Sequence, residues 1–308
     1  FHNRGLTYRK LEKYDEAIAD FDKTILMDPV HYKAYYNRGY CQELLGKFDK
    51  AELDYFSALK LKPDNIIVLH RLGQMFEKKG ETDKKALKLA EKYYMKVLKI
   101  NPNHAASYNG LALVYDSIKD KEKALRYFDK ALAIEPENPV FLHNKGCCLR
   151  RMKKFEESLP YLYSALKIEP ENCTFHATLG TVLRKMDRWE DAIKAYSAEL
   201  KFEPNSIKAL NNRAFCLSKQ GNSKEAIIDY TKVLTLDPTN VHALHNRGIS
   251  LQTSGKYNEA IEDFTELIRL NPENVSAYFN RGSCYDKLGQ VDKALGDYSS
   301  ALELESNL

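Results

Sequence analysis

Apolar residues along this chain recur at the three- and four-residue spacing that places them on one face of an α-helix. The segments 51–59 and 260–268 both show this spacing, with apolar residues at their first, fifth, eighth and ninth positions. Gly46 and Gly255 precede these segments, where one short helix has to end and the next has to begin. The pattern predicts pairs of short helices joined by glycine-containing turns.

The helical pattern has a fixed period. Eight prolines are separated by 34 residues, with one interval of 39: Pro29, Pro63, Pro102, Pro136, Pro170, Pro204, Pro238 and Pro272. Most glycines fall in two slots of this period, one at Gly5, Gly39, Gly73, Gly146, Gly180, Gly248 and Gly282, the other at Gly46, Gly80, Gly221, Gly255 and Gly289. The chain is therefore expected to be an array of helical hairpins. Because one hairpin cannot bury its apolar faces alone, neighbouring hairpins must stack.

The order of residue types in each period resembles the tetratricopeptide repeat (TPR) family: a large apolar residue, Gly or Ala, an aromatic, Ala, an aromatic and a closing Pro. The final unit contains Tyr278, Gly282, Tyr285, Ala294, Tyr298 and Ala301, although Ser306 replaces the closing Pro. The resemblance covers nine units: 1–31, 32–65, 66–104, 105–138, 139–172, 173–206, 207–240, 241–274 and 275–308. It is most similar to the Asn-Arg-Gly subtype of TPR scaffolds. It implies an all-α fold, a right-handed α-solenoid of nine helix-turn-helix repeats, as a single domain over residues 1–308.

The chain departs from the regular repeat in its fifth unit and at its two ends. Ser158 replaces the usual Ala of the second helix and Pro160 follows, which is expected to weaken or bend that helix near its start. The sequence opens in mid-unit without a methionine and stops without the polar capping helix that solenoid ends need for solubility. We therefore expect it to be a segment of a longer protein.

Composition excludes several classes of protein. With 44% hydrophobic and 29% charged residues, the chain lies within the range of folded globular proteins. No segment approaches the roughly 18 uninterrupted apolar residues of a membrane helix, and no signal segment opens the chain. Six cysteines are too few for a disulfide framework in 308 residues. We therefore expect a cytoplasmic protein without membrane insertion.

The net charge of +4 is small but unevenly distributed. Residues 1–154 contain 30 Lys and Arg against 21 Asp and Glu, a net charge of +9. Residues 155–308 contain 17 against 22, a net charge of −5. This asymmetry can orient a charged partner, but it is too diffuse to indicate nucleic acid without a concentrated basic face.

The sequence contains no complete catalytic motif. The glycine pairs that precede Lys47 and Lys256 are seven residues apart rather than the five of a phosphate-binding loop, and no Ser or Thr follows the lysine. His242 and His245 share a helix face but have no evident third metal ligand. Four cysteines occupy a slot that holds Val or Met in other units, which is typical of the core: Cys41, Cys148, Cys216 and Cys284. We expect no enzyme, no catalytic residues, no cofactor and no metal site.

A polar slot lies beside the small-residue slot of the first helix, and it contains Asn3, Asn37, Asn144, Asn212, Asn246 and Asn280. In the resembled family the first helix lines a concave groove, where a similar asparagine ladder can hold peptide backbones. An amide suits this task because it both donates and accepts hydrogen bonds, whatever the side chains of the peptide. The resemblance therefore implies that these residues bind a partner. The alternative is that the amides brace neighbouring helices.

Basic residues gather near the end of the first helix in units five and six: Arg150, Arg151, Arg184 and Lys185. Earlier units have Glu43, Glu77 and Asp116 at the slot of Arg150. The groove is therefore expected to change sign midway. An acidic stretch of a partner would then lie over units five and six.

The second helix of unit three carries lysines at three- and four-residue steps: Lys85, Lys88, Lys92, Lys96 and Lys99. A solvated helix face is the simplest explanation. The alternative is a binding site, centred on Lys88, Lys92 and Lys96, for an acidic protein tail or a nucleic-acid backbone. Nucleic acid is disfavoured because no aromatic residues flank the lysines.

Two further slots vary together among the units. Five units combine an arginine before the small residue with an aspartate in the second helix: Arg4 with Asp20, Arg38 with Asp54, Arg213 with Asp229, Arg247 with Asp263, and Arg281 with Asp297. The other four units have neither residue. Pairing each arginine with the preceding unit would break this correspondence, so we expect an ion pair within each unit. Duplication of one repeat subtype is the alternative explanation.

Together these features favour a non-catalytic protein–protein interaction scaffold that takes a partner segment in its concave groove. One alternative is the substrate-recruiting arm of a larger enzyme such as a glycosyltransferase. Another is a structural component of a cytoskeletal or ciliary assembly, where long TPR rods occur and acidic tails would suit the lysines. The expected partner is a protein or peptide segment, acidic in part, within a larger complex. The fold alone does not identify it.

Overall fold

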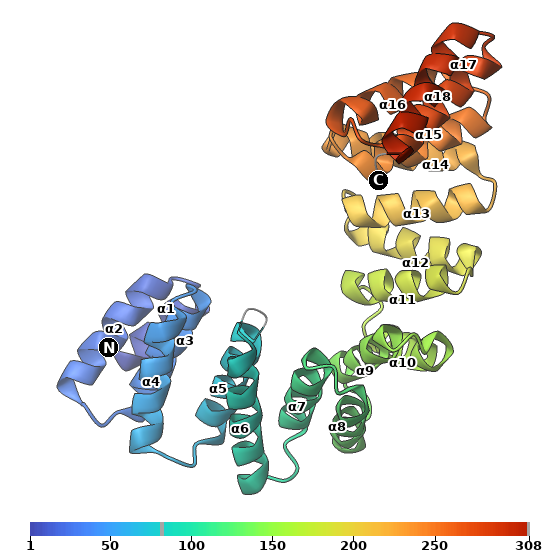
Figure 1. The fold of residues 1–308 in the computed structure, drawn as a ribbon. Helices are drawn as coiled ribbons and strands as arrows, with labels where there is room; N and C mark the ends of the chain where they lie inside the picture. Colours follow the sequence, from blue (N-terminus) through green and yellow to red (C-terminus); the bar gives the residue numbers. More distant parts are fainter. Residues whose placement is uncertain (81–82, 307–308) are drawn as a thin grey trace. The chain divides into compact units, whose positions relative to one another are not determined.

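The computed structural model describes residues 1–80 and 83–306, and all secondary structure in these ranges is α-helical (Figure 1). The chain forms two compact units, Phe1–Cys148 and Leu149–Leu308. The N-terminal unit contains α1 (His2–Lys10), α2 (Tyr14–Met27), α3 (Tyr32–Leu44), α4 (Phe48–Leu61), α5 (Ile66–Lys79), α6 (Lys84–Ile100), α7 (Ala105–Ser117), α8 (Lys121–Ile134) and most of α9 (Pro139–Arg151).

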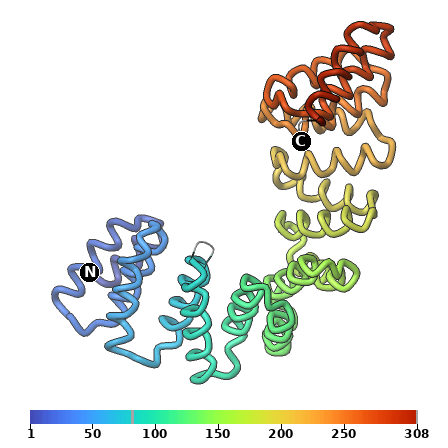
Figure 2. The backbone as a smooth tube through the Cα atoms, in the orientation of Figure 1, coloured from blue at the N-terminus to red at the C-terminus, as the bar shows by residue number. Residues whose placement is uncertain are grey.

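The C-terminal unit begins within α9. Its further helices are α10 (Phe155–Ile168), α11 (Cys173–Lys185), α12 (Trp189–Phe202), α13 (Ile207–Lys219), α14 (Ser223–Leu236), α15 (Val241–Thr253), α16 (Tyr257–Leu270), α17 (Val275–Lys287) and α18 (Val291–Ser306). In each unit consecutive helices form antiparallel hairpins, and each hairpin packs against the next (Figure 2). The predicted all-α array of stacked hairpins is confirmed.

The second glycine slot forms the turn between the two helices of a hairpin. Gly46, Gly221, Gly255 and Gly289 have φ angles between +72° and +85°, a region that glycine adopts without steric cost. Four hairpins place another residue at this turn with positive φ: Glu12, Lys119, Lys153 and Asp187. The third hairpin differs, because Gly80 has a φ of −64° at the end of α5. In the eight other hairpins the turn geometry is constant, while the residue that supplies it varies.

The first glycine slot allows the two helices of a hairpin to approach closely. A Cβ atom on Gly73 would lie 2.6 Å from the ring of Tyr94, and one on Gly248 would lie 2.8 Å from the ring of Phe264. Both rings are fully buried. The aromatic slot of the second helix therefore fills the space that the small residue leaves, which explains why the two slots recur together.

The cysteine slot lies in the core, as the sequence predicts. Cys41, Cys148, Cys216 and Cys284 are fully buried, and so is Met75 in the same slot. Burial raises the pKa of Cys41, Cys216 and Cys284 to about 11. These thiols therefore remain protonated at neutral pH and pack as small apolar side chains.

Pro160 does not interrupt the second helix of its hairpin. Helix α10 is continuous from Phe155 to Ile168, and Pro160 lies on its exposed side. The proline lacks the N–H that would bond to the carbonyl of Glu156. Ser158 is buried, and its Oγ donates to the carbonyl of Phe155 at 2.8 Å. The predicted departure in this helix is therefore a missing hydrogen bond within a continuous helix.

The five predicted ion pairs all lie within a hairpin. In each pair the Nε and Nη2 groups of the arginine donate to the two carboxylate oxygens of the aspartate, at 2.6–2.9 Å. The aspartate side chains are at most 9% exposed. The coupling between the two slots thus reflects a direct two-point contact between the first and second helices.

The same arginines also reach the preceding hairpin, which the sequence pattern does not reveal. Arg38 Nη1 donates to Asp22 Oδ1 at 2.5 Å, and Arg247 Nη1 donates to Thr231 Oγ1 at 3.1 Å. Arg213 and Arg281 make equivalent bonds to Ser197 and Thr265. One guanidinium therefore connects the two helices of its own hairpin and the second helix before it.

Candidate functional site

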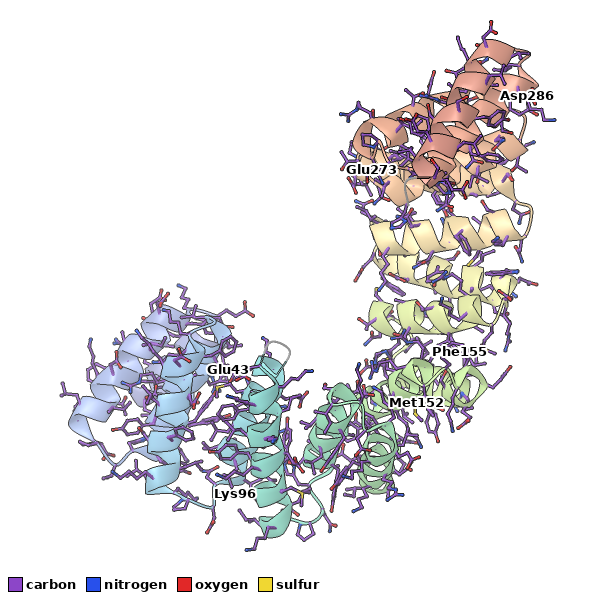
Figure 3. All side chains as sticks on the ribbon, viewed as in Figure 1. Glu43, Lys96, Met152, Phe155, Glu273 and Asp286 are labelled. Carbon is purple, nitrogen blue, oxygen red and sulfur yellow. The ribbon has the colours of Figure 1, made fainter. Side chains whose placement is uncertain are left out.

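The odd-numbered helices are the first helices of the hairpins, and on them the asparagine slot lies one turn before the cysteine slot. We name the surface formed by the partly exposed side chains of these helices the first-helix face. In the N-terminal unit it is formed by α1, α3, α5 and α7, and in the C-terminal unit by the last residues of α9 and by α11, α13, α15 and α17. Figure 3 shows the side chains that project from these helices and labels Glu43 on α3.

Buried tyrosines of the N-terminal unit direct their hydroxyl groups toward acids of the first-helix face. Tyr55 Oη donates to Glu43 Oε2 at 2.6 Å, and Tyr94 Oη donates to Glu77 Oε2 at 2.6 Å. Burial raises the pKa of both tyrosines far above the ordinary value, so both hydroxyls remain donors. Arg71 Nε lies 3.1 Å from Glu43 Oε2 and joins α5 to α3. These carboxylates are therefore already engaged within the repeats.

Tyr40 links three first helices. The guanidinium carbon of Arg71 lies 4.2 Å from the centroid of its ring, and that of Arg9 lies 5.3 Å from it. Arg9 Nη1 also donates to Asn37 Oδ1 at 2.6 Å. Cation–π contacts and the hydrogen bond hold these side chains together across α1, α3 and α5. The sequence analysis did not identify this network, because its members occupy different slots in successive repeats.

A pocket of about 420 Å³ lies on the first-helix face of the N-terminal unit. His70, Glu77, Tyr94, Asn109 and Phe141 are among its lining residues. His70 Nδ1 lies 3.0 Å from Ser107 Oγ. Burial, together with the neighbouring His104, lowers the pKa of His70 to about 4, so its ring is neutral at pH 7. The pocket therefore combines apolar walls with the neutral groups of His70 and Asn109 and the carboxylate of Glu77.

Residues of the asparagine slot form hydrogen bonds both within one helix and between helices. Asn37 Nδ2 donates to the carbonyl of Lys33 at 2.7 Å, Asn246 Nδ2 donates to that of His242 at 2.9 Å, and Asn280 Nδ2 donates to Ser276 Oγ at 3.3 Å. Asn144 Nδ2 instead donates to Asn109 Oδ1 at 3.0 Å. Asn3 is exposed and Asn212 is half-buried. Three of these amides thus donate within their own helix, whereas Asn144 joins α9 to α7 as the alternative interpretation expects. Partner binding by this slot stays a prediction.

The basic residues at the ends of α9 and α11 differ from one another in burial. Arg150 and Arg184 are half-buried, whereas Arg151 and Lys185 are exposed. The Nε atoms of Arg150 and Arg184 are buried and have no hydrogen-bond partner among the described residues. The guanidinium carbon of Arg184 lies 5.6 Å from the ring centroid of Phe215. Neither arginine forms an ion pair with a carboxylate in the described part of the chain.

The predicted change of sign along the groove is weaker than the residue types imply. Glu43 pairs with Arg71, and Asp116 pairs with Lys121 at 2.5 Å, so the acids at the slot of Arg150 have nearby cations. The two arginines of the C-terminal unit are not compensated in this way. The first-helix face therefore contains paired charges in the N-terminal unit and unpaired positive charges in the C-terminal unit.

The lysines of α6 lie on a solvent-exposed helix face. Lys85, Lys88, Lys92, Lys96 and Lys99 are all exposed, and none forms an ion pair within the described ranges. Lys96, labelled in Figure 3, lies over the ring of Tyr93, with Nζ 5.6 Å from the ring centroid. Leu89 and Met95 are partly exposed on the same helix, at 38% and 49%. This helix face therefore combines unpaired positive charge with some apolar surface.

Helix α12 contains a buried carboxylate, Glu199, that the sequence pattern did not predict. Glu199 is only 4% exposed and occupies a second-helix slot that holds Ala58 and Ala131 in other repeats. Ser206 Oγ donates to its Oε1 at 3.0 Å, while Oε2 is buried without a partner among the described residues. Burial raises the pKa of Glu199. The detectable signal was an acid in a slot that is uncharged in the other repeats.

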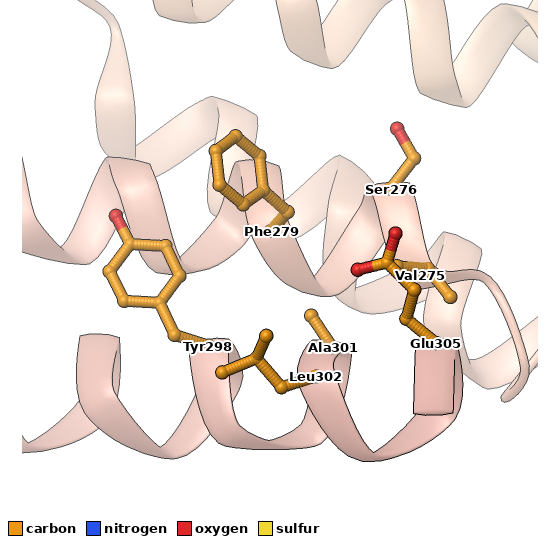
Figure 4. Close-up of a pocket in the computed structure, with 7 residues that line it drawn as sticks. All are labelled: Val275, Ser276, Phe279, Tyr298, Ala301, Leu302 and Glu305. Carbon is orange, nitrogen blue, oxygen red and sulfur yellow. The ribbon is translucent and has the colours of Figure 1, made fainter. Parts of the chain in front are cut away.

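An apolar pocket of about 680 Å³ lies on α17 and α18 (Figure 4). Phe279, Tyr298 and Leu302 contribute much of its wall, with Glu305 at one side. Phe279 and Leu302 are 57% and 67% exposed. In the preceding hairpin Phe264 and Leu267 are buried in the cluster that includes Ala277 and Cys284 of α17. The pocket therefore corresponds to the stacking face that a following first helix covers elsewhere in the array.

Within the described ranges, no group of three or more His, Cys, Asp or Glu side chains has an arrangement that could hold a metal ion. None of the described helices has the length and apolar character needed to cross a membrane.

Solved structures that are similar to this chain share its architecture. YrrB, described as a TPR protein with an unusual peptide-binding site, is 24% identical with a TM-score of 0.56, over 60% of this chain and 95% of its own. One structure of MamA is 22% identical with a TM-score of 0.54, over 56% and 93% of the two chains. MamA from Desulfovibrio magneticus RS-1 is 20% identical with a TM-score of 0.53, over 55% and 96%. At these identities the likeness establishes the fold alone.

Sequence profiles of the tetratricopeptide repeat match most of the chain, whereas no curated protein matches it. The matched segments are 2–66, 67–104, 105–138, 127–159, 207–240 and 245–307. Apart from 127–159, which begins within α8 and ends within α10, the matched segments span helical hairpins of the two units. The small and aromatic residues lie where the repeat requires them. The chain belongs to the tetratricopeptide repeat family.

Proposed function

We propose that the chain is a non-catalytic scaffold whose first-helix face binds an extended segment of a partner protein, and that an acidic stretch of this segment contacts Arg150 and Arg184. The observation that carries the proposal is the state of these two arginines. Each is half-buried on the first-helix face, with a buried Nε that has no partner and no carboxylate paired with it in the described ranges. The asparagine slot would contribute hydrogen bonds to the same segment.

Physical chemistry supports an anionic ligand for these arginines. A partly desolvated guanidinium without a counter-charge gains more from a carboxylate than an exposed one does, because the lower dielectric strengthens the interaction. Its planar donors also suit two-point binding of a carboxylate. Elsewhere in the chain buried arginine donors do find carboxylates, as Arg213 and Arg247 do. The similar protein YrrB is described as having a peptide-binding site, which agrees with this type of ligand.

The test uses a labelled oligoglutamate peptide of about 12 residues, with a Gly-Ser peptide of equal length as the neutral comparison. Replacing Arg150 and Arg184 with Glu should weaken oligoglutamate binding by about tenfold, slow its association and flatten its dependence on salt. Fluorescence anisotropy and stopped-flow measurements at several salt concentrations give these quantities.

Arg269→Glu is the matched control, because Arg269 is an exposed arginine on the second helix α16 that already pairs with Glu266. It makes the same change of net charge per residue without altering the first-helix face. The proposal is wrong if the control weakens binding as much per charge as the double variant does, or if oligoglutamate binds no better than the Gly-Ser peptide.

A further inference from the structure

The aromatic slot of the second helix contains four tyrosines that are almost fully buried: Tyr55, Tyr94, Tyr196 and Tyr230. Three of their hydroxyls have partners, Glu43 at 2.6 Å, Glu77 at 2.6 Å and Thr181 at 3.4 Å. The hydroxyl of Tyr230 is buried and has no hydrogen-bond partner among the described residues. A buried hydroxyl without a partner lowers stability, because it loses its bonds to water.

Sequence differences on α13 explain why the Tyr230 hydroxyl has no hydrogen-bond partner there. Ser218 occupies the slot that holds Glu43 and Glu77 in the N-terminal unit, and Phe215 occupies the slot of Thr181. Phe215 offers no polar atom. Ser218 Oγ lies 2.8 Å from Ser250 Oγ, and Ser250 donates to the carbonyl of Asn246 at 2.8 Å. Ser218 must therefore donate to Ser250, which connects α13 to α15 without satisfying Tyr230.

The unpartnered hydroxyl belongs to a residue that lines a cavity of about 240 Å³ on the first-helix face. Phe215 and Ile249 provide apolar walls, while Ser218, Asn246 and Ser250 provide polar groups. Asn246 Nδ2 already donates to the carbonyl of His242, so its Oδ1 is left as an acceptor. The cavity therefore offers a buried donor, Tyr230 Oη, and an acceptor, Asn246 Oδ1.

A neutral group that accepts one hydrogen bond and donates another matches this cavity. A carboxamide does both with a planar group, whereas a carboxylate only accepts and would place its charge beside the Asn246 oxygen. Lys219 also lines the cavity, but its Nζ lies 5.4 Å from the centroid of the Phe215 ring and the residue is exposed. Arg184 contacts Phe215 as well, with its guanidinium carbon 5.6 Å from the ring centroid, but it does not line the cavity. No cation that lines the cavity is therefore buried there to offset a desolvated carboxylate.

We propose that the cavity of α13, α14 and α15 binds a carboxamide group, with Tyr230 Oη donating to its carbonyl oxygen and Asn246 Oδ1 accepting from its N–H. The group is either a backbone peptide unit or the side chain of Asn or Gln in the bound segment. This site deepens the proposed function and rests on it for its biological ligand. It lies apart in sequence from Arg150 and Arg184, and it makes a different chemical demand on the partner.

The test uses small probes and needs no partner protein. N-methylacetamide represents the backbone peptide unit, propionamide represents the side-chain carboxamide, and propionate is the charged isostere of propionamide. Each is titrated into the isotopically labelled protein, and the amide signals of α13 and α15 are followed by NMR. At least one amide should give saturable shifts confined to these helices, and propionate should bind at least several-fold more weakly. The amide that binds more tightly identifies the source of the group.

Tyr230→Phe should weaken amide binding by about threefold to tenfold, the value of one hydrogen bond, without lowering the unfolding midpoint. Phenylalanine already fills this slot at Phe21, Phe128 and Phe264. Tyr196→Phe is the matched control and should leave the titration unchanged. Asn246→Ala provides a second variant, which should also weaken binding because it removes the acceptor.

The site assignment is overturned if neither amide shifts α13 and α15, if propionate binds as tightly as propionamide, or if Tyr230→Phe binds as wild type does. A failure of the oligoglutamate experiment would leave these titrations unaffected, because they contain no acidic peptide. The two proposals therefore fail separately.

Discussion

At the scale of single residues, covariation inside one chain identified contacts that composition could not. Arginine and aspartate appear and disappear together between repeats, and the structure places each pair in two-point contact. The bonds of the same arginines to the preceding hairpin were not predictable, because their acceptors change from Asp22 to Ser197 to Thr231. Coupling is visible in sequence only where both partners are fixed in type.

The lack of a partner for the Tyr230 hydroxyl could not be predicted from the sequence, for a related reason. Its lack of a partner results from a combination of Phe215, Ser218 and Ser250, none of which is unusual by itself. The serine at the slot of Glu43 was visible in the sequence, but its direction toward Ser250 depends on how α13 and α15 pack. Residue types can therefore be assigned to slots from sequence, whereas their hydrogen-bond partners require the structure.

The pair of Arg247 and Asp263 provides a direct test at this scale. Replacing Arg247 with Leu leaves a carboxylate that is 3% exposed without its cation, and it should lower the free energy of unfolding by about 1–3 kcal/mol. The double variant Arg247→Leu with Asp263→Tyr should recover most of this loss, because Leu111 and Tyr127 occupy these slots in another repeat. Chemical denaturation of the four proteins gives the coupling energy, and strictly additive losses would contradict a direct pair.

The pH dependence of Arg247→Leu provides an independent check. Burial already raises the pKa of Asp263, and removing the arginine should raise it further. A carboxylate whose folded-state pKa lies above its unfolded value stabilises the fold below that unfolded value and loses this contribution as pH rises through the folded pKa. The single variant should therefore approach wild-type stability at acidic pH, and the difference should increase toward neutral pH.

At the scale of helices, the two glycine slots were the main basis for predicting the helix pairs and the turns between them. One slot is small because an aromatic ring lies against it, and the other has positive φ at four of its five glycines, with Gly80 as the exception. The turns formed by Lys153 and Asp187 adopt the same geometry without glycine, so packing of the two helices imposes it. For α6 the sequence predicts where the lysines lie on the helix. It does not predict what they bind, because that depends on a partner.

Replacing Lys88, Lys92 and Lys96 with Gln should leave helicity and the unfolding midpoint unchanged, since exposed lysines contribute little to stability. The change removes three unpaired charges from α6. It should weaken binding of oligoglutamate to this helix and reduce the dependence on salt. Circular dichroism and anisotropy measure the two effects. Lys201→Gln, which changes an exposed lysine of α12, is the control for loss of a lysine.

A loss of helicity in the triple variant would show that the lysine face is packed, which contradicts its exposure. Unchanged oligoglutamate binding, in a background that also carries the two glutamates at positions 150 and 184, would show that α6 is only a solvated face. Measuring in that background separates the lysine face from the first-helix face.

At the scale of the whole molecule, the period predicted the architecture because each hairpin contacts mainly its neighbours in sequence. A chain built in this way has no central core, and its stability is close to a sum of hairpin stabilities and interfaces between neighbours. Apolar clusters follow this rule in the C-terminal unit, where one contains Tyr230 and Val233 and the next contains Phe264 and Leu267. The position of a substitution should therefore determine which helices it affects.

Amide hydrogen exchange of Asp263→Ala tests this view. The substitution breaks the bonds of Arg247 to α16, so protection should fall most in α15 and α16 and less in the neighbouring α14 and α17. Helices α1 to α4 of the N-terminal unit should exchange at wild-type rates. The mirror variant Asp54→Ala breaks the bonds of Arg38 and should reverse the distribution, since it acts on α3 and α4. A uniform loss of protection in either variant would mean that all hairpins unfold as one cooperative body, and the nearest-neighbour description would then be wrong for this chain.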